Sequence, residues 1–272
     1  VIHLLTNRGQ AMQLYHNAVS TCSQKVRMVI HEKGLMVEDH LIDLQKGEQF
    51  SEDYVRLNPN AVVPTLIDDN KVMIESTLIN EYLDDAYPEK NLKPESEVER
   101  YLMRLICKKI DDSLHPACGI VTYSIGMRPG LLARPQAEVE AMVAKIPNPT
   151  RRATRRAVID YGVAAPQFRE AMLSFRALFD LAEALLEERE WLTGSTFSLA
   201  DCALMPYVLR LDHLRQEDEI NSRVNLSRWY EAIQQRQSYS KAVTQWAPAG
   251  AIAMLNKTGL ATQAEIAAAM EN

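Results

Sequence analysis

The sequence has few cysteines, no long apolar run and no internal repeat. Its four cysteines (Cys22, Cys107, Cys118 and Cys202) are scattered and lack the spacing of a disulfide framework or a metal site. This usage indicates a reducing, cytoplasmic setting, and no metal is predicted. No apolar run approaches the roughly 18 residues of a membrane-spanning helix. No segment has the pattern of a signal peptide, so we expect no membrane association.

The charge is mildly acidic and unevenly distributed. Residues 1–90 carry 8 Lys and Arg against 14 Asp and Glu, whereas residues 91–272 carry 22 of each, which gives a formal net charge of -6. Without a general basic excess, nucleic acid is not an expected partner. Because 47% of the 272 residues are hydrophobic, the chain can bury one large core or two modest ones.

The N-terminal third alternates short strand-like and helix-like segments. Strands are predicted at 13–16, 37–44, 62–67 and 71–74, and helices at 22–33, within 46–57 and at 75–87. The order βαβ, α, ββα predicts a thioredoxin-like α/β domain over residues 12–88. Residues 1–11 have no place in this order, and we interpret them as an N-terminal extension, a cloning remnant or a mis-assigned start.

The remaining sequence has no strand-like alternation and predicts an all-α C-terminal domain. Residues 89–97 are polar and are interpreted as a linker. The helical domain is expected over 98–246, with a long insertion at 116–166, and an Ala-rich helical extension over the pocket at 247–272. Helices are predicted at 98–114, 168–188, 198–213 and 226–236.

Ser20, Thr21 and Cys22 stand where the first helix is expected to begin. A helix N-terminus has unpaired N–H groups and a partial positive charge, both of which stabilise a thiolate and lower the pKa of a cysteine. Taken alone, Ser20 is equally explained as an N-cap and Cys22 as a small buried residue.

Two further motifs add groups that suit a small anionic peptide. If the Val63–Pro64 bond is cis, the backbone groups of Val63 can pair with an extended peptide; the alternative is an ordinary edge proline. Ser76 at a helix start can donate to a carboxylate and Glu75 can face an ammonium group; the alternative is a simple helix cap. Together with the thiol motif, these residues predict a site for glutathione.

These motifs resemble those of the glutathione transferases, from Met12 to about Trp246. The run Ser20-Thr21-Cys22-Ser23 is similar to the serine–cysteine signature of the zeta class, and more closely to bacterial glutathione-dependent dehalogenases. Ile146-Pro147-Asn148-Pro149 resembles a stretch of bacterial β-aryl etherases, whose pattern lacks the Ser-x-Cys-Ser run. Phe197-Ser198-Leu199-Ala200-Asp201 is similar to the family's structural capping box.

The resemblance implies glutathione as co-substrate, a homodimer, and site residues on both domains. Ser20 would hold the glutathione sulfur as a thiolate, and Cys22 is the alternative catalytic group. The implied glutathione contacts are Ser20, Thr21, Gln49, Val63, Pro64, Glu75 and Ser76. Asp111 or Asp112 would face the partner subunit. His16 and Tyr123 are weaker candidates for the substrate pocket, since such residues are more often structural.

Three functions follow as hypotheses. The first is a glutathione transferase acting on an aromatic or hydrophobic electrophile, with a β-aryl ether as one candidate. The second is a Cys22-dependent thiol-transferase or reductive dehalogenase. The third is a non-catalytic interaction protein with the same fold. The four arginines between 151 and 156 either bind an acidic group or form a solvated helix face.

Overall fold

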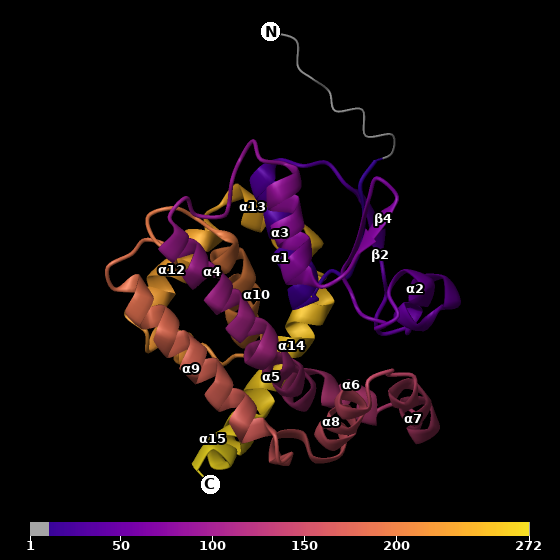
Figure 1. The fold of residues 1–272 in the computed structure, drawn as a ribbon. Helices are drawn as coiled ribbons and strands as arrows, with labels where there is room; N and C mark the ends of the chain where they lie inside the picture. Colours follow the sequence, from indigo (N-terminus) through magenta and orange to yellow (C-terminus); the bar gives the residue numbers. More distant parts are fainter. Residues whose placement is uncertain (1–10, 272) are drawn as a thin grey trace.

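Four short strands form a mixed sheet near the N-terminal end of the chain. The computed structural model describes residues 11–271, so the predicted extension lies outside the described residues except for Ala11. The strands are β1 (Gln13–His16), β2 (Glu38–Leu41), β3 (Thr65–Asp68) and β4 (Lys71–Met73). Their order is β2-β1-β3-β4, with β1 parallel to β2 and antiparallel to β3. Helices α1 (Thr21–Lys33) and α3 (Ser76–Ala86), with the short η1 (Glu48–Phe50) and α2 (Glu52–Leu57), complete the unit (Figure 1). The predicted thioredoxin-like domain is confirmed.

Three strands are shorter than predicted, and for β2 and β3 the reason is local. The Asp43 carboxylate accepts the backbone N–H groups of Gln45 (2.9 Å) and Lys46 (3.2 Å). This Asx-type turn ends β2 before Asp43. β3 begins only after Pro64, because proline has no N–H to donate to a strand ladder.

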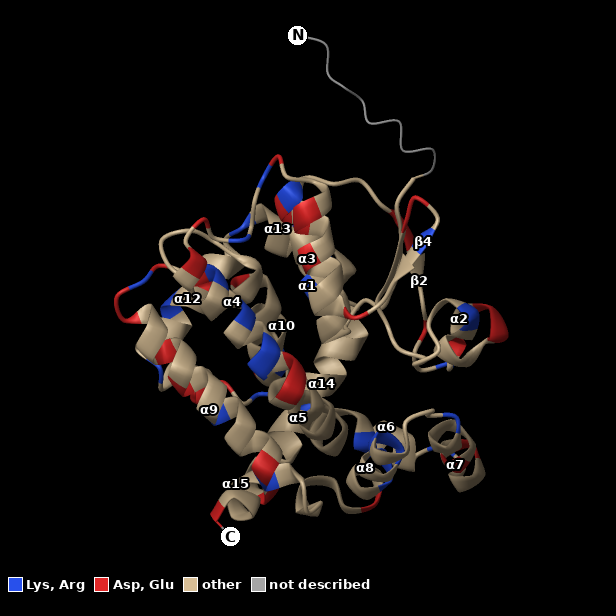
Figure 2. Cartoon of the chain, viewed as in Figure 1, with Lys and Arg blue, Asp and Glu red and all other residues tan. Residues whose placement is uncertain are grey.

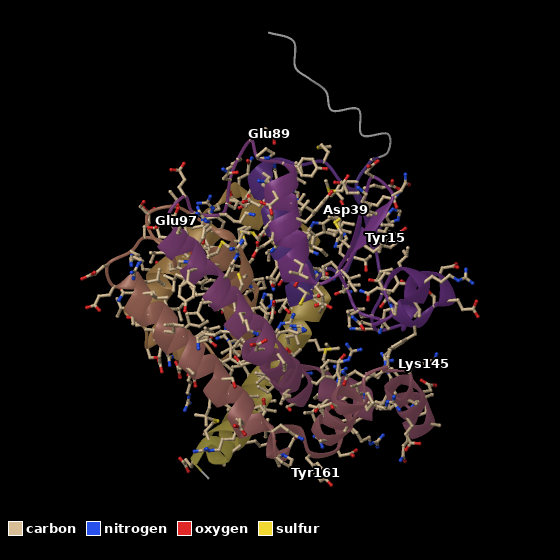
Figure 3. The ribbon with its side chains drawn as sticks, viewed as in Figure 1. Tyr15, Asp39, Glu89, Glu97, Lys145 and Tyr161 are labelled. Atoms are coloured by element: carbon tan, nitrogen blue, oxygen red, sulfur yellow. The ribbon has the colours of Figure 1, made fainter. Side chains whose placement is uncertain are left out.

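The other described elements are all helical, which confirms the predicted C-terminal helical domain. They are α4 (Glu97–Lys109), η2 (Ile110–Leu114), α5 (His115–Val121), η3 (Thr122–Met127), α6 (Arg128–Leu132), α7 (Gln136–Ala144), α8 (Pro149–Tyr161), η4 (Gly162–Ala164), α9 (Phe168–Leu186), α10 (Leu199–His213), α11 (Asp218–Asn221), α12 (Val224–Gln234), α13 (Gln237–Ala242), η5 (Thr244–Trp246), α14 (Ala249–Ala261) and α15 (Gln263–Glu271). In Figure 3, Tyr15 and Asp39 mark the sheet, whereas Lys145 and Tyr161 mark the ends of α7 and α8. None of the helices within residues 11–271 is long and apolar enough to cross a membrane.

The segment 116–166, expected as an insertion, is largely helical. Helix α4 continues through the π-helical turns η2 and η3, with α5 between them. Pro116 and Pro129 each stand in the first turn of a helix, where the missing N–H would have no intrahelical partner. Asn148 caps α8 by accepting the Arg151 N–H (2.9 Å).

The C-terminal extension forms two helices rather than one. Helix α14 ends where the Thr262 hydroxyl donates to the Thr258 carbonyl (2.9 Å), a local bond that competes with the backbone ladder. Gly259 seats α14 against the body of the protein, because a Cβ atom there would overlap the Leu214 carbonyl oxygen.

Helix α10 is the buried centre of the helical part and packs against α1. Its predicted capping box is present. The Asp201 carboxylate accepts the Ser198 N–H and hydroxyl (each 2.8 Å), and its other oxygen accepts the Leu192 N–H (3.0 Å) and the Trp229 indole (2.8 Å). This fixed start sets the position of Tyr207 and Arg210, which lie further along the same helix.

Candidate active site

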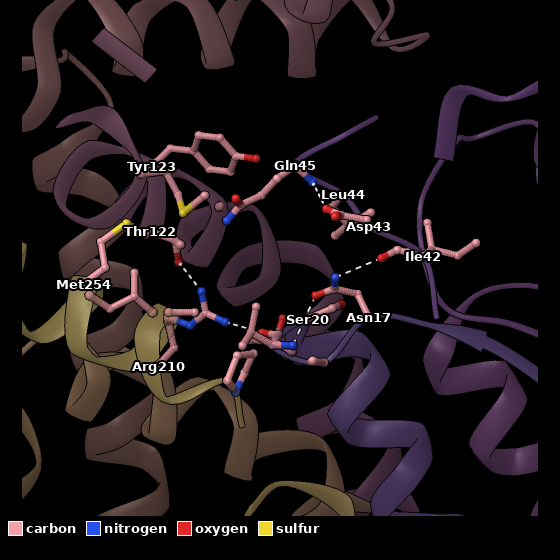
Figure 4. A pocket seen from close by; sticks show the side chains of 18 of the residues that line it. Asn17, Ser20, Ile42, Asp43, Leu44, Gln45, Thr122, Tyr123, Arg210 and Met254 are labelled. Carbon is pink, nitrogen blue, oxygen red and sulfur yellow. Dashed lines mark hydrogen bonds between the residues drawn. The ribbon is translucent and has the colours of Figure 1, made fainter. Parts of the chain in front are cut away.

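A cavity of about 740 Å³ lies between the thioredoxin-like and helical parts (Figure 4). Residues 17–21 and 41–48 contribute to one side, and helices α5 to α7 and α10 contribute to the other. Helix α14 adds Ala251, Met254 and Leu255 to the wall, together with Pro248, which precedes it. The lining is predominantly apolar, which suits a hydrophobic molecule held by a few polar groups.

Ser20 is the N-cap of α1 and lines this cavity. Its side-chain oxygen accepts the backbone N–H of Ser23 (3.3 Å). Because this cap uses a lone pair, the hydroxyl proton stays available for donation to a group in the cavity. Thr21, the first residue of the helix, also lines the cavity.

Two buried arginines hold the three backbone carbonyls that precede Ser20. Arg27 donates to the carbonyls of Asn17 (2.9 Å) and Ala18 (2.8 Å), and Arg210 donates to that of Val19. Consecutive carbonyls with charged donors leave the loop little freedom to rotate. Neither arginine was predicted to hold this loop.

Cys22 is not among the residues that line the cavity, and it contacts two residues of the helical part. Its sulfur lies 3.5 Å from His115 Nδ1 and 4.0 Å from the Tyr207 hydroxyl, and His115 Nδ1 lies 3.2 Å from the same hydroxyl. Burial alone would raise the pKa of the Cys22 thiol. The pKa is nevertheless lowered to about 6. The effect of burial is outweighed first by the charge and hydrogen bond of His115, and then by the charge of Lys25 and a hydrogen bond from Ser76. The negative charge of Cys22 in turn raises the pKa of His115.

The N-termini of α1 and α3 meet at this point, since Ser76 opens α3 and reaches Cys22. Glu75 caps α3 with a φ of 69°, a left-handed conformation that is strained for a residue with a side chain. Asn60 Nδ2 lies 3.5 Å from a Glu75 carboxylate oxygen. The Val63–Pro64 peptide bond is cis.

Several predicted site residues lie outside the cavity wall. His16 is a correction: it is fully buried, 2.8 Å from the Arg27 guanidinium, with its ring edge-on to Trp246. Burial and then the charge of Arg27 lower its pKa to about 3, so it is a neutral structural residue. The wall includes Gln45 but not Gln49. The glutathione contacts suggested for Gln49, Val63, Pro64, Glu75 and Ser76 therefore stay predictions.

Tyr123 does line the cavity, and one of the four neighbouring arginines covers it. The Arg155 guanidinium carbon lies 3.0 Å from the centre of the Tyr123 ring, a cation–π contact. Arg156 pairs with Asp160 (3.1 Å), an ordinary pair one turn apart. Figure 2 shows these basic residues on α8, beside α6. The arginine-rich run therefore serves packing as well as solvation.

Asp111 joins the two domains within one chain. Its carboxylate accepts from Lys25 Nζ (3.2 Å) and the Thr77 hydroxyl (3.0 Å), and Lys25 is fully buried. Asp112 pairs with Lys108 (2.7 Å). Within residues 11–271, no group of three or more His, Cys, Asp or Glu side chains is placed to hold a metal ion.

Comparison with known proteins assigns the chain to one family. Residues 14–91 match the glutathione S-transferase N-terminal domain and residues 165–232 match its C-terminal domain. The chain is 30% identical to protein LigF of Sphingobium sp. over 70% of its own length and 75% of that relative's. This chain belongs to the glutathione S-transferase superfamily, a family of glutathione-dependent enzymes, as its motifs predicted.

Solved structures and other relatives agree with this assignment. The structure of the beta-etherase LigF has a TM-score of 0.77 at 25% identity and covers 86% of this chain and 98% of its own. A zeta-class maleyl pyruvate isomerase has a TM-score of 0.67 at 23% identity, which shows the fold alone. A stringent starvation protein A homolog of Coxiella burnetii is 26% identical over 86% of this chain and 92% of its own length.

Proposed function

We propose that the protein is a glutathione transferase in which Ser20 holds the glutathione sulfur as a thiolate. The observation that carries this proposal is the state of the Ser20 hydroxyl. Its oxygen accepts the Ser23 N–H, no acceptor for the hydroxyl is found within residues 11–271, and the residue lines the cavity. A fixed donor aimed at a developing or full negative charge stabilises it without reorganisation.

The reaction that suits this arrangement is nucleophilic displacement. The thiol proton passes to solvent, and the thiolate then attacks an electrophilic carbon. A carbon–sulfur bond forms as the bond to an aryloxide or halide breaks, and the leaving group takes the electron pair. The apolar wall favours an aromatic acceptor, and the similarity to a protein described as a beta-etherase favours an aryl ether.

The second candidate function uses Cys22 as a nucleophile. The contact with His115 and the lowered pKa favour it, because a thiolate is present at neutral pH. Cys22 would take the glutathionyl group from a mixed disulfide and release the other thiolate. A glutathione thiolate would then attack the Cys22–glutathione disulfide, which releases glutathione disulfide and restores the Cys22 thiolate.

We also propose a homodimer formed through α3 and α4. Leu78, Val98 and Tyr101 are large apolar residues that are 64%, 75% and 67% exposed on these two helices. An exposed apolar face of this kind is typical of a protein–protein interface. Light scattering after size-exclusion chromatography should give the mass of two chains, and Leu78→Glu should shift it towards one.

The test of the proposed function combines binding and turnover with the full-length protein. We expect retention on immobilised glutathione, elution by free glutathione, and cleavage of a fluorogenic aryl ether. Loss of turnover on Ser20→Ala alone supports thiolate stabilisation. Loss on Cys22→Ala alone, with reduction of a chlorinated hydroquinone, supports the thiol-transfer alternative. Absence of both binding and turnover would leave the non-catalytic interaction role.

A further inference from the structure

Arg210 is a buried cation in the wall of the cavity. It lies in the last turn of α10, is only 7% exposed, and faces the cavity beside Thr122 (Figure 4). Its Nη2 donates to the Val19 carbonyl and its Nη1 lies 3.5 Å from the Thr122 hydroxyl. A guanidinium has five N–H donors, so three of them find no acceptor among residues 11–271.

The charge of Arg210 has no negative partner in the described chain. His213 and Cys118, which interact with the charge of Arg210, carry no negative charge, and the nearby carboxylate in sequence is engaged elsewhere. Burial and the charge of Arg210 lower the pKa of His213 to about 4, and burial raises the pKa of the Cys118 thiol. The Asp212 carboxylate accepts from the Tyr230 hydroxyl (3.1 Å). The C-terminal end of α10 offsets part of the charge, but a buried charge ordinarily has a full partner.

Arg27 shows how the same chain satisfies a buried arginine that has only a structural role. Each of its three side-chain nitrogens has an acceptor: the Ala242 carbonyl (2.7 Å), the Asn17 and Ala18 carbonyls, and His16. The ring of Trp246 covers its charge. Arg27 does not line the cavity, whereas Arg210 does and keeps donors unused. The contrast indicates that Arg210 is set up for a group that enters the cavity.

We infer that Arg210 anchors an anion-binding subsite for an apolar acid, a molecule with a bulky hydrophobic body and one carboxylate. The carboxylate would take the free Nη hydrogens of Arg210, and the body would lie against Met254 and Leu255 of α14. The inference deepens the proposed function, on which it rests for its catalytic meaning, because it names the class of acceptor that the cavity selects.

The test measures binding alone, so it does not depend on turnover. Biphenyl-4-carboxylate and biphenyl-4-carboxamide are titrated calorimetrically into the full-length protein, with and without saturating S-methylglutathione. These probes share their size and apolar surface and differ in charge. We expect the acid to bind about tenfold or more tightly than the amide, the effect of a hydrogen bond to a charged group. Equal affinities in the unmodified protein would overturn the inference without any variant.

Variants then separate an anion site from a purely structural role. Arg210→Gln should bring the ratio of the two dissociation constants close to one, whereas Arg210→Lys should keep part of it. If Arg210→Gln weakens acid and amide equally, Arg210 only positions the Val19 carbonyl and the inference is wrong. Arg134→Gln is the charge-matched control, since Arg134 also lines the cavity but is exposed. An equal loss of discrimination in Arg134→Gln would point to a diffuse potential instead of a subsite.

Two further outcomes keep this inference distinct from the proposed function. Displacement of the acid by S-methylglutathione would place Arg210 in the glutathione site and overturn the acceptor subsite. Ser20→Ala should keep the ratio of the acid and amide dissociation constants. The binding result can therefore be interpreted even if the chemistry assigned to Ser20 is wrong. Retained discrimination with no turnover would therefore count against the proposed function alone.

Discussion

Replacement of Ser20 by alanine tests the central chemical claim, because it removes one hydroxyl and leaves the rest of the cavity wall in place. The Ser20 proton is the donor that we assign to the glutathione thiolate. Removal of a single preorganised donor to an anionic centre typically lowers kcat by about 10²–10³. The pKa of the bound thiol should rise by about one to two units, since a hydrogen bond to a charged group is lost.

The same change removes the cap of α1, and this second effect has to be separated from the first. Loss of an N-cap costs about 1 kcal/mol of folding free energy, which lowers Tm by about 2–4 °C in a chain of this size. Ser96→Ala is the matched control, because Ser96 caps α4 through the Glu99 N–H (3.5 Å) far from the cavity wall. Both variants should lose similar stability, and only Ser20→Ala should lose turnover. Ser20→Thr keeps the hydroxyl oxygen and its proton, so it should retain both the stability and the turnover of the unmodified protein.

The assay is the pH dependence of kcat/KM with an activated aryl halide. For the unmodified protein the rate should rise with pH and level off once the bound thiol is ionised. In Ser20→Ala the plateau should move to higher pH, so part of the lost rate returns in alkali. An unchanged midpoint with unchanged turnover would refute the assignment of Ser20. A fall in rate at every pH with no shift would mean that Ser20 positions the substrate instead of ionising the thiol.

Three other predictions address the thiol, the wall and the core. Cys22 should be the single fast site of alkylation by iodoacetamide in intact-mass spectra, with a rate that falls as the pH drops below about 6. His115→Gln should move the midpoint of this pH dependence upward. An unchanged midpoint would exclude the pairing of Cys22 with His115. Gly259→Ala should raise KM for an apolar acceptor by displacing α14, whereas Gly250→Ala, on the same helix with open space around it, should not; equal values would show that α14 does not shape the cavity. Asp201→Ala should lower the free energy of unfolding in urea by about 3 kcal/mol or more, because four buried donors lose their acceptor; a loss below about 1 kcal/mol would contradict this account.

Local patterns were sufficient to predict the order of the elements and the helix start at Ser20. Alternation and apolar spacing located each strand and most helices, and Gly34 ends α1 in the left-handed conformation that a glycine adopts readily. The helices within 116–166 were not predicted, since this segment was described only as an insertion. Pro116 and Pro129 in fact occupy first turns, where proline is compatible with a helix.

The site itself depends on contacts that no local pattern encodes. Cys22 meets His115 across 93 positions of the chain, and Val19 meets Arg210 across 191. His115 and Arg210 have no distinctive neighbours in the sequence, so only the packing of α10 against α1 and α5 brings them into place. His16 was misplaced for the same reason: it is close to Ser20 in sequence, but its side chain is buried against Arg27 and Trp246 and does not line the cavity.

The two buried arginines connect the fold to the chemistry of the cavity. Ser20 can donate to a thiolate only if its backbone is held while the negative charge forms, and the preceding three carbonyls are the means of holding it. Arg27 fixes two of them, and each of its side-chain nitrogens already has an acceptor. Its role is therefore confined to holding the loop. Arg210 fixes the third and retains free donors on the cavity side. Arg210 therefore both completes the rigid Ser20 loop and can bind the negative charge of an acceptor. A substrate acid bound to Arg210 would therefore lie next to the loop that carries Ser20, which gives the cavity a physical basis for selecting apolar acids over neutral molecules of the same shape.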